Sequence, residues 1–229
     1  MQQENVIMEA INLKITSELK EKCPQMALGT IHCQVKNTQR SEKLWKEIDI
    51  VSEEIRKKYQ LETIKTNKQI TATRNMYLAC GKKPGRYRPS SEALMRRIVK
   101  GVGLYQINTL VDLINLVSLK SGYSIGAFDA DYIVGNIEAG IGKENEPYQG
   151  IGKGQINIHG LPVLRDEKGA IGTPTSDEVR TAIRPDTSNL FINFNGYTGA
   201  DDIKETLDYT VKLLKEVAEA KNISVKYVE

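Results

Sequence analysis

The segment Ile107–Lys120 restricts the fold more than any other, because apolar residues surround almost the whole of the helix that their spacing predicts. A helix that is apolar on most sides has to be covered by other helices or by a sheet. We expect it to end at Gly122, since glycine readily adopts the left-handed conformation that follows many helices. The apolar face contains Ile107, Leu110, Val111, Ile114 and Val117, and Leu113 and Leu116 widen it.

The polar side chains of this helix are short and form one stripe, made of Asn108, Asp112 and Asn115. A stripe that faces solvent usually carries Lys and Glu, whereas short polar groups suit fixed hydrogen bonds. Two interpretations remain open. The stripe either forms a structural network inside the protein or lines the wall of a ligand pocket.

The sequence before this helix predicts helices separated by one strand and a loop. Apolar stripes with i, i+4 spacing, serine caps and a closing proline mark the helices. The segment Thr63–Cys80 is polar and weakly periodic, which indicates irregular structure or a short helix. The other expected elements are a helix over Val6–Lys22, a strand over Ala27–Val35, a helix after Ser41, a loop over Gly81–Pro89 and a helix from Ser90 to about Lys100.

After Gly122 the sequence changes to short strands bounded by glycines, followed by a helix that Asp201 caps and a last strand over Ile223–Val228. No linker or repeat divides the chain, so we predict one α+β domain over residues 1–229, with mixed β-sheets packed against helices. Thr175–Glu178 matches a capping box. The expected middle strands are Ser124–Val134, Asn136–Ile141, Gln155–Leu164, Gly169–Gly172 and Leu190–Asn195.

The sequence lacks the residue patterns of three common kinds of functional site: a P-loop, a Ser-His-Asp triad and a metal site. The Gly-Lys pairs at Lys143 and Lys153 do not match a P-loop, because Glu144 and Gly154 follow the lysines. The two histidines do not fit a Ser-His-Asp arrangement, and no metal-ligand spacing occurs. We therefore expect no metal and no cofactor.

The three cysteines are widely spaced and suggest reduced thiols. No apolar run reaches the roughly 18 residues of a membrane helix, and the N-terminus lacks the pattern of a signal peptide. These features predict a cytoplasmic protein without a membrane partner. They leave the oligomeric state open.

Between Cys80 and Tyr105 the chain carries seven Lys and Arg residues against the single acid Glu92. Such a cluster attracts phosphates, although a solvated helix face has the same composition. The arginines of this cluster are Arg86, Arg88, Arg96 and Arg97.

Three consecutive segments resemble one known family. These are 87–97, with an arginine-bearing helix, 107–119, with Asn108-Thr109-Leu110-Val111-Asp112, and 126–133, with Gly126-Ala127-Phe128-Asp129-Ala130-Asp131. The sequence is similar to the B3/B4 domain of the phenylalanyl-tRNA synthetase β subunit, and Asp186–Ile192 resembles a later segment of it. The resemblance implies a B3/B4 core over about 86–196, an N-terminal extension of helix and strand, and a freestanding copy of the domain.

The resemblance also implies a function, because in that family the domain hydrolyses the ester of tyrosine wrongly attached to the phenylalanine tRNA. A hydrophobic synthesis pocket cannot strongly reject an analogue that adds a hydroxyl, so a second site removes the product. This chain has Gly126 where the family has histidine and Asn193 where bacterial members have glutamate. Both differences bear on the amino acid that is recognised.

The expected site follows from this resemblance. An aminoacylated tRNA 3′ end would enter a pocket, Asn193 and Thr181 would contact water or the amino group, and the four arginines would bind phosphates. The alternatives are a non-catalytic module that binds tRNA or an amino acid, and a hydrolase or sensor for another aminoacyl ligand. The expected pocket residues are Asn108, Asp112, Asn115, Gly126, Phe128 and Asp129.

Overall fold

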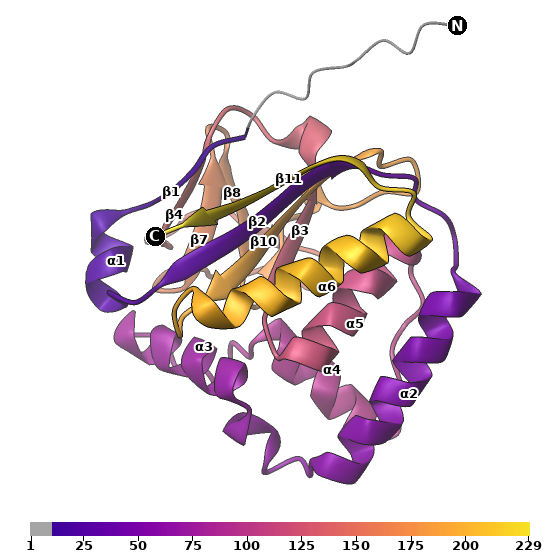
Figure 1. The fold of residues 1–229 in the computed structure, drawn as a ribbon. Helices are drawn as coiled ribbons and strands as arrows, with labels where there is room; N and C mark the ends of the chain where they lie inside the picture. Colours follow the sequence, from indigo (N-terminus) through magenta and orange to yellow (C-terminus); the bar gives the residue numbers. More distant parts are fainter. Residues whose placement is uncertain (1–10) are drawn as a thin grey trace, which may run out of the picture.

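The structure is a computed structural model that describes residues 11–229, apart from the side chains of residues 201 and 202. Its centre is an antiparallel four-stranded sheet in the order β11-β2-β10-β3 (Figure 1). Strand β10 pairs with β2 along its whole length, from Asn189↔Gln34 to Gly196↔Ala27. The strands are β2 (Ala27–Gln34), β3 (Ile125–Asp129), β10 (Asn189–Gly196) and β11 (Lys221–Val228).

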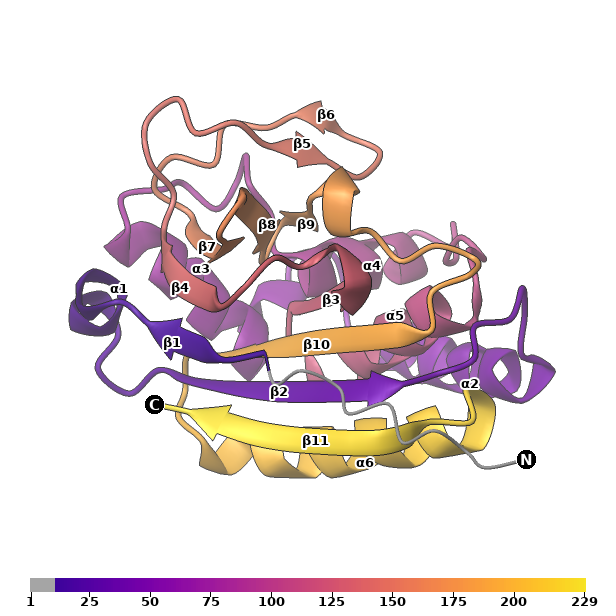
Figure 2. The same ribbon diagram turned by 90° about the horizontal axis from the view of Figure 1, so that it is seen from above.

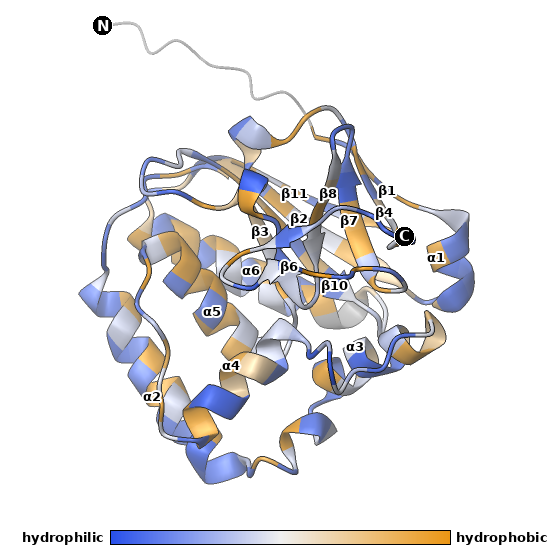
Figure 3. Cartoon of the chain, turned by 180° about the vertical axis from the view of Figure 1, so that it is seen from behind, coloured by the Kyte–Doolittle hydropathy of each residue, from blue (hydrophilic) through white to orange (hydrophobic). Residues whose placement is uncertain are grey.

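Four helices cover one face of this sheet and form the larger apolar core with it (Figure 1). Leu110, Leu113 and Val117 of the central helix are fully buried there, and Figure 3 shows that helix as largely hydrophobic. The prediction of a buried helix is confirmed. The four helices are α2 (Glu42–Lys58), α4 (Ser90–Val99), α5 (Thr109–Ser121) and α6 (Asp201–Val217).

A second sheet, in the order β1-β4-β7-β8-β9, lies against the other face of the first (Figure 2). Phe128 and Phe191 of the first sheet meet Leu164 and Ile171 of the second in a separate buried cluster. The cavity described below lies between these two sheets. The strands are β1 (Leu13–Ile15), β4 (Ile137–Ile141), β7 (Pro162–Asp166), β8 (Gly169–Thr173) and β9 (Ser176–Asp177), and β5 (Gln149–Gly150) and β6 (Gly154–Gln155) form a small hairpin.

The start of the described chain differs from the helix predicted over Val6–Lys22, of which residues 6–10 lie outside the described part. Leu13–Ile15 forms β1, which pairs in parallel with β4, and only α1 (Ser17–Lys22) is helical. Thr16 caps α1 by accepting a hydrogen bond from the Leu19 N–H. The prediction was wrong because pairing with a neighbouring strand outweighed a local apolar spacing that suited a helix.

The segment Thr63–Cys80 is more regular than expected. It contains a 3-10 turn (Ile64–Thr66) and a three-turn helix, α3 (Lys68–Ala79). The side chain of Asn67 caps α3 by accepting hydrogen bonds from the N–H groups of Gln69 and Ile70. Several polar residues of α3 are buried in this fold, which hides the helical apolar stripe in the sequence.

Two strand predictions were too long, and the capping box was wrong. The segment expected as one strand over Gln155–Leu164 is divided by a turn at Gly160, which has a positive φ of 73°. The segment after β3 becomes a 3-10 turn over Ala130–Tyr132. Thr175 does not cap a helix, because its hydroxyl pairs with Tyr77.

The α+β class predicted from the sequence is confirmed, with mixed sheets packed against helices. Within residues 11–229, no helix combines the length and the apolar character that crossing a bilayer requires.

Candidate functional site

Gly126 and Asn193 lie opposite each other on the paired strands β3 and β10. Both positions face the second sheet, where Asn193 is fully buried. Its Nδ2 donates to Asn195 Oδ1 at 3.1 Å, and Asn195 Nδ2 donates to the Ser124 carbonyl at 2.9 Å. The Oδ1 atom of Asn193 has no hydrogen-bond partner among the described residues. A buried acceptor left in this way indicates a place for water or for a ligand.

A cavity lies beside Gly126, between the two sheets. The space open to the centre of a water-sized sphere is about 10 Å³, and its walls include Gly126, Phe128, Asp177 and Asn195. The ring of Phe128 occupies much of the region between two glycines. A Cβ atom on Gly126 would lie 2.7 Å from Phe128 Cζ, and one on Gly172 would lie 2.6 Å from the same atom. The two glycines therefore make room for the ring.

Asp177 supplies the charged group of this cavity. It lies on β9, and its Oδ2 accepts a hydrogen bond from the Ala127 N–H at 3.2 Å. Burial raises the pKa of the Asp177 carboxyl to about 7, while the Ala127 N–H and the positive charge of Lys153 act in the opposite direction. A carboxyl with a pKa near neutrality exists in both forms at physiological pH, as acid–base catalysis requires.

The turn at Pro174 and Thr175 borders the cavity and is fixed from several sides. The Tyr77 hydroxyl pairs with Thr175 Oγ1 at 2.9 Å, and Lys153 Nζ donates to the Thr175 carbonyl at 2.8 Å. The Ser90 N–H donates to the Pro174 carbonyl at 2.8 Å. This last contact joins the start of α4 to the edge of the cavity.

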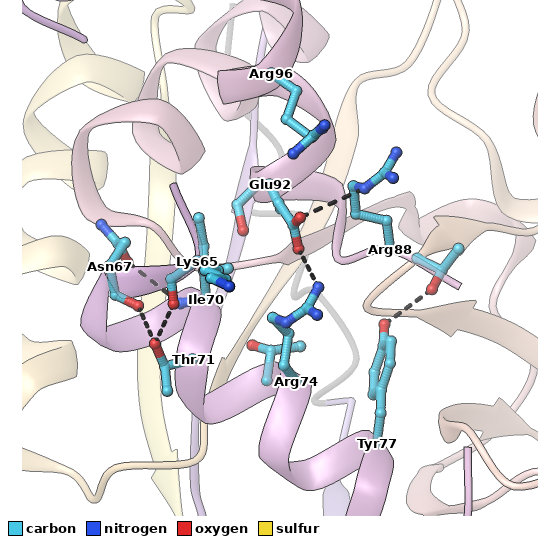
Figure 4. Close-up of polar contacts among 12 residues, drawn as sticks. Lys65, Asn67, Ile70, Thr71, Arg74, Tyr77, Arg88, Glu92 and Arg96 are labelled. Atoms are coloured by element: carbon cyan, nitrogen blue, oxygen red, sulfur yellow. Dashed lines mark hydrogen bonds and ion pairs between the residues drawn. The ribbon is translucent and has the colours of Figure 1, made fainter. Parts of the chain in front are cut away.

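Close to this junction, two arginines share one buried carboxylate. Glu92, only 4% exposed in its side chain, accepts from Arg74 Nη1 at 2.9 Å and lies 3.4 Å from Arg88 Nε. Figure 4 shows Arg74, Arg88 and Arg96 around Glu92, with the terminal nitrogens of Arg88 directed away from the carboxylate. Two guanidinium groups and one carboxylate leave an excess positive charge, and free N–H donors of this kind bind phosphate well.

The sequence profile of the B3/4 domain family matches residues 72–219, which is more than half of the chain. The chain belongs to the B3/4 domain family. The match begins earlier and ends later than the core of about 86–196 that we expected from the sequence. It therefore takes in Arg74 as well as Gly126, Phe128, Asp177 and Asn195 of the cavity wall.

Curated relatives of this B3/4 domain are β subunits of phenylalanine–tRNA ligase. The protein of Mycoplasma genitalium is 38% identical over 117 residues, which are 47% of this chain and 14% of that protein. The protein of Bartonella henselae is 34% identical over 84 residues, 36% of this chain and 10% of that protein. The chain is thus a domain related to a tRNA synthetase, and it matches only a small part of the relatives' length.

A solved structure of an N-terminal fragment of the phenylalanyl-tRNA synthetase β subunit from Pyrococcus horikoshii is also similar. The similarity covers 97% of this chain and 53% of that chain, with a TM-score of 0.49 and 16% sequence identity.

The polar stripe of α5 has a structural role at the start of the helix. Asn108 Oδ1 accepts from the Val111 N–H at 3.0 Å and caps α5. Asp112 is buried and accepts from Trp45 Nε1 at 2.8 Å and from the Ile107 N–H at 3.0 Å. Neither residue, nor Asn115, lines the cavity beside Gly126. The structural network, left open above, accounts for Asn108 and Asp112.

The other expected site residues are dispersed. Asp129 ends β3, where its Oδ2 accepts from the Thr187 hydroxyl at 2.7 Å. Thr181 is fully buried, and its hydroxyl lacks a partner among the described residues, but it does not line the cavity. Gly126 and Phe128 are therefore the expected pocket residues that the structure brings together.

The predicted phosphate-binding arginines do not form one group. Arg96 donates to the Leu61 carbonyl at 3.0 Å, and Arg97 donates to the Gly103 carbonyl at 3.0 Å. The Cζ atom of Arg97 also lies 3.9 Å from the ring centroid of Tyr105, and that of Arg86 lies 5.8 Å from the ring centroid of Tyr87.

Sequence reasoning missed Asp177, Gly172, Asn195 and Arg74. Asp177 was assigned to a capping box, and Arg74 lay in the segment without clear periodicity. A signal existed for Gly172, since a glycine inside an expected strand suggests close approach of another group. No pattern in the sequence indicates that Asp177 lies beside β3. Within residues 11–229, no group of three His, Cys, Asp or Glu side chains is arranged to hold a metal ion.

Proposed function

We propose that this B3/4 domain binds the aminoacylated 3′ end of a tRNA and hydrolyses the ester of a wrongly attached amino acid in trans. The observation that carries the proposal is the cavity between the sheets, which Gly126 and Asp177 line. Opposite Gly126 on β10, the buried Oδ1 of Asn193 has no hydrogen-bond partner among the described residues. The relatives are tRNA ligase subunits, which supports tRNA as the partner. An aminoacyl ester is reactive, so positioning water beside it contributes much of the catalysis.

In this proposal the ester carbonyl lies at the cavity, and Asn193 Oδ1 accepts a hydrogen bond from the water or the amino group. Thr181, the last residue of η3 (Val179–Thr181), is a second candidate for such a contact, because its buried hydroxyl has no partner among the described residues, although it lies outside the cavity wall. The arginines at Glu92 bind the phosphate of the terminal nucleotides. Asn108 and Asp112 support the site indirectly by fixing the start of α5 against α2.

The test is hydrolysis of a panel of tRNAs carrying correct and incorrect amino acids. We expect the purified protein to release at least one incorrect amino acid faster than the correct one, and faster than buffer alone. Binding is measured in parallel with the same aminoacyl-tRNAs. Failure to bind or hydrolyse any member of a full panel would contradict the proposal.

A second candidate function is a tRNA-binding module without hydrolytic activity. The position of Phe128 favours it, because the fully buried ring fills the region between Gly126 and Gly172 and leaves room for little more than one water. The panel separates the two candidates. Binding without release of any amino acid supports the module.

A further inference from the structure

Asp177 is held so that one carboxylate oxygen is fixed and the other is available. Oδ2 accepts from the Ala127 N–H, whereas Oδ1 receives no hydrogen bond from the described residues. Oδ1 lies 3.5 Å from the position of a Cβ on Gly126 and 3.1 Å from that of a Cβ on Gly172. The available oxygen therefore faces the two glycines, beside the ring of Phe128 that occupies much of the space between them.

The cavity at this oxygen has the size and the polarity for one water molecule. Its volume of about 10 Å³ is near the smallest that holds a water, and such a water needs two or more polar partners. Asp177 and Asn195 line the cavity. Asn193 does not line the cavity itself, but its Nδ2 donates to Asn195 Oδ1 and so orients the amide that does.

From this arrangement we infer that Asp177 is the general base of the proposed hydrolysis, an inference that rests on the proposed function. Oδ1 of Asp177 takes a proton from the water while the water oxygen bonds to the carbonyl carbon of the ester. The bond between that carbon and the ribose oxygen then breaks, and the proton passes from Asp177 to the ribose oxygen. The products are the free amino acid and a tRNA with its terminal hydroxyl restored.

The surrounding charges permit this role. Lys153, whose Nζ is fixed on the Thr175 carbonyl, favours the ionised carboxylate. Tyr148 donates to the Ser176 carbonyl. Burial raises the pKa of its hydroxyl, and the negative charges of Asp177 and Glu178 raise it further. With the pKa of Asp177 at about 7, the basic form gains population as the pH rises through neutrality.

The test uses the full chain and the aminoacyl-tRNA that it hydrolyses fastest, in single-turnover reactions. We expect Asp177→Asn to lower the rate constant by about 10²- to 10⁴-fold, as is typical for loss of a general base, and to leave the Kd for the aminoacyl-tRNA unchanged. The matched control is Asp186→Asn, an exposed carboxylate near η3. It should keep the wild-type rate, because it removes the same charge away from the cavity.

The wild-type rate should rise between about pH 5.5 and about pH 8.5 with an inflection near neutrality, and should be lower in D₂O. This profile gives a result even if Asp177→Asn does not fold. A flat wild-type profile, or a folded Asp177→Asn protein that retains at least a third of the rate, overturns the role of Asp177 while hydrolysis itself stands. A wild-type protein that binds but does not hydrolyse overturns the proposed function and this inference together.

Discussion

At the scale of single residues, the contact between Gly126 and Phe128 depends on the absence of a side chain. The glycine is on a regular strand, so its role is to provide space, and a Cβ there would lie 2.7 Å from the ring. The ring of Phe191 stacks beside that of Phe128, with 6.5 Å between the ring centroids, and limits the movement of the Phe128 ring. Gly172 of the second sheet makes room for the same ring, since a Cβ there would lie 2.6 Å from Phe128 Cζ.

We expect Gly126→Ala to lower the free energy of unfolding by about 1–3 kcal/mol, because the added methyl overpacks a closely packed region. Denaturant unfolding measures the change. The control is Gly85→Ala, where no atom lies within 4 Å of the added Cβ. The double variant Gly126→Ala, Phe128→Leu should lose less stability than the sum of the two single changes. Strict additivity would mean that the two residues do not compete for this space.

Asp177 gives stability a defined pH dependence. Its pKa is raised in the folded protein to about 7, so the protonated carboxyl contributes stability that is complete below its ordinary pKa and is lost as the pH rises through about 7. We expect Asp177→Asn to be free of this loss. The stability of the variant relative to wild type should increase from about pH 5 to about pH 8 in thermal or denaturant unfolding. A constant difference across that range would show that the folded-state pKa is not raised.

At the scale of elements, the start of α5 is fixed by its own polar stripe and by α2. Asn108 caps the helix, and Asp112 links the preceding turn to Trp45. These contacts lie at one end of the helix, while its apolar face carries the packing.

Replacing Asn108 by alanine should lower the free energy of unfolding by about 1 kcal/mol, since the Val111 N–H loses its partner. Asn115→Ala is the matched control, because it makes the same change on the same helix at a position where no hydrogen bond is formed by the side chain. Chemical denaturation of both variants measures the difference. Equal losses would remove the cap as the cause.

How much of the fold could be predicted differs from element to element. Helix α5 was predicted correctly because its apolar spacing agrees with its packing in the fold. Helix α2 was predicted correctly for the same reason, together with its cap at Ser41. β1 could not be predicted, because its pairing partner β4 is more than a hundred residues away. The full set of residues around the cavity could not be predicted for the same reason. Gly126 was identified from a resemblance, but Asp177 is brought to it only by the arrangement of the two sheets.

At the scale of the whole molecule, the arginines at Glu92 and the cavity are joined through the contact of Ser90 with Pro174. In the proposed function, one bound tRNA end contacts both. The excess positive charge of Arg74 and Arg88 would then act on the same molecule whose ester lies at the cavity.

The double variant Arg74→Gln, Arg88→Gln should weaken binding of an acceptor-stem RNA and reduce the slope of log K against log salt by about 1–2, because up to two phosphate contacts are lost. Titration of a labelled RNA at several salt concentrations measures this slope. Arg56→Gln is the control, as its ion pair with Glu53 lies on α2. An unchanged slope in the double variant would exclude both arginines from phosphate contact.

The central sheet joins segments from opposite ends of the described chain, since β11 pairs with β2. During synthesis, β2 leaves the ribosome long before β10 and β11 exist, and non-local strand pairing of this kind is slow. The nascent chain must therefore keep β2 from pairing with other molecules until residue 228 has been made. Helix α6, which packs against β2, is itself made only after β10, so it cannot cover β2 in the meantime.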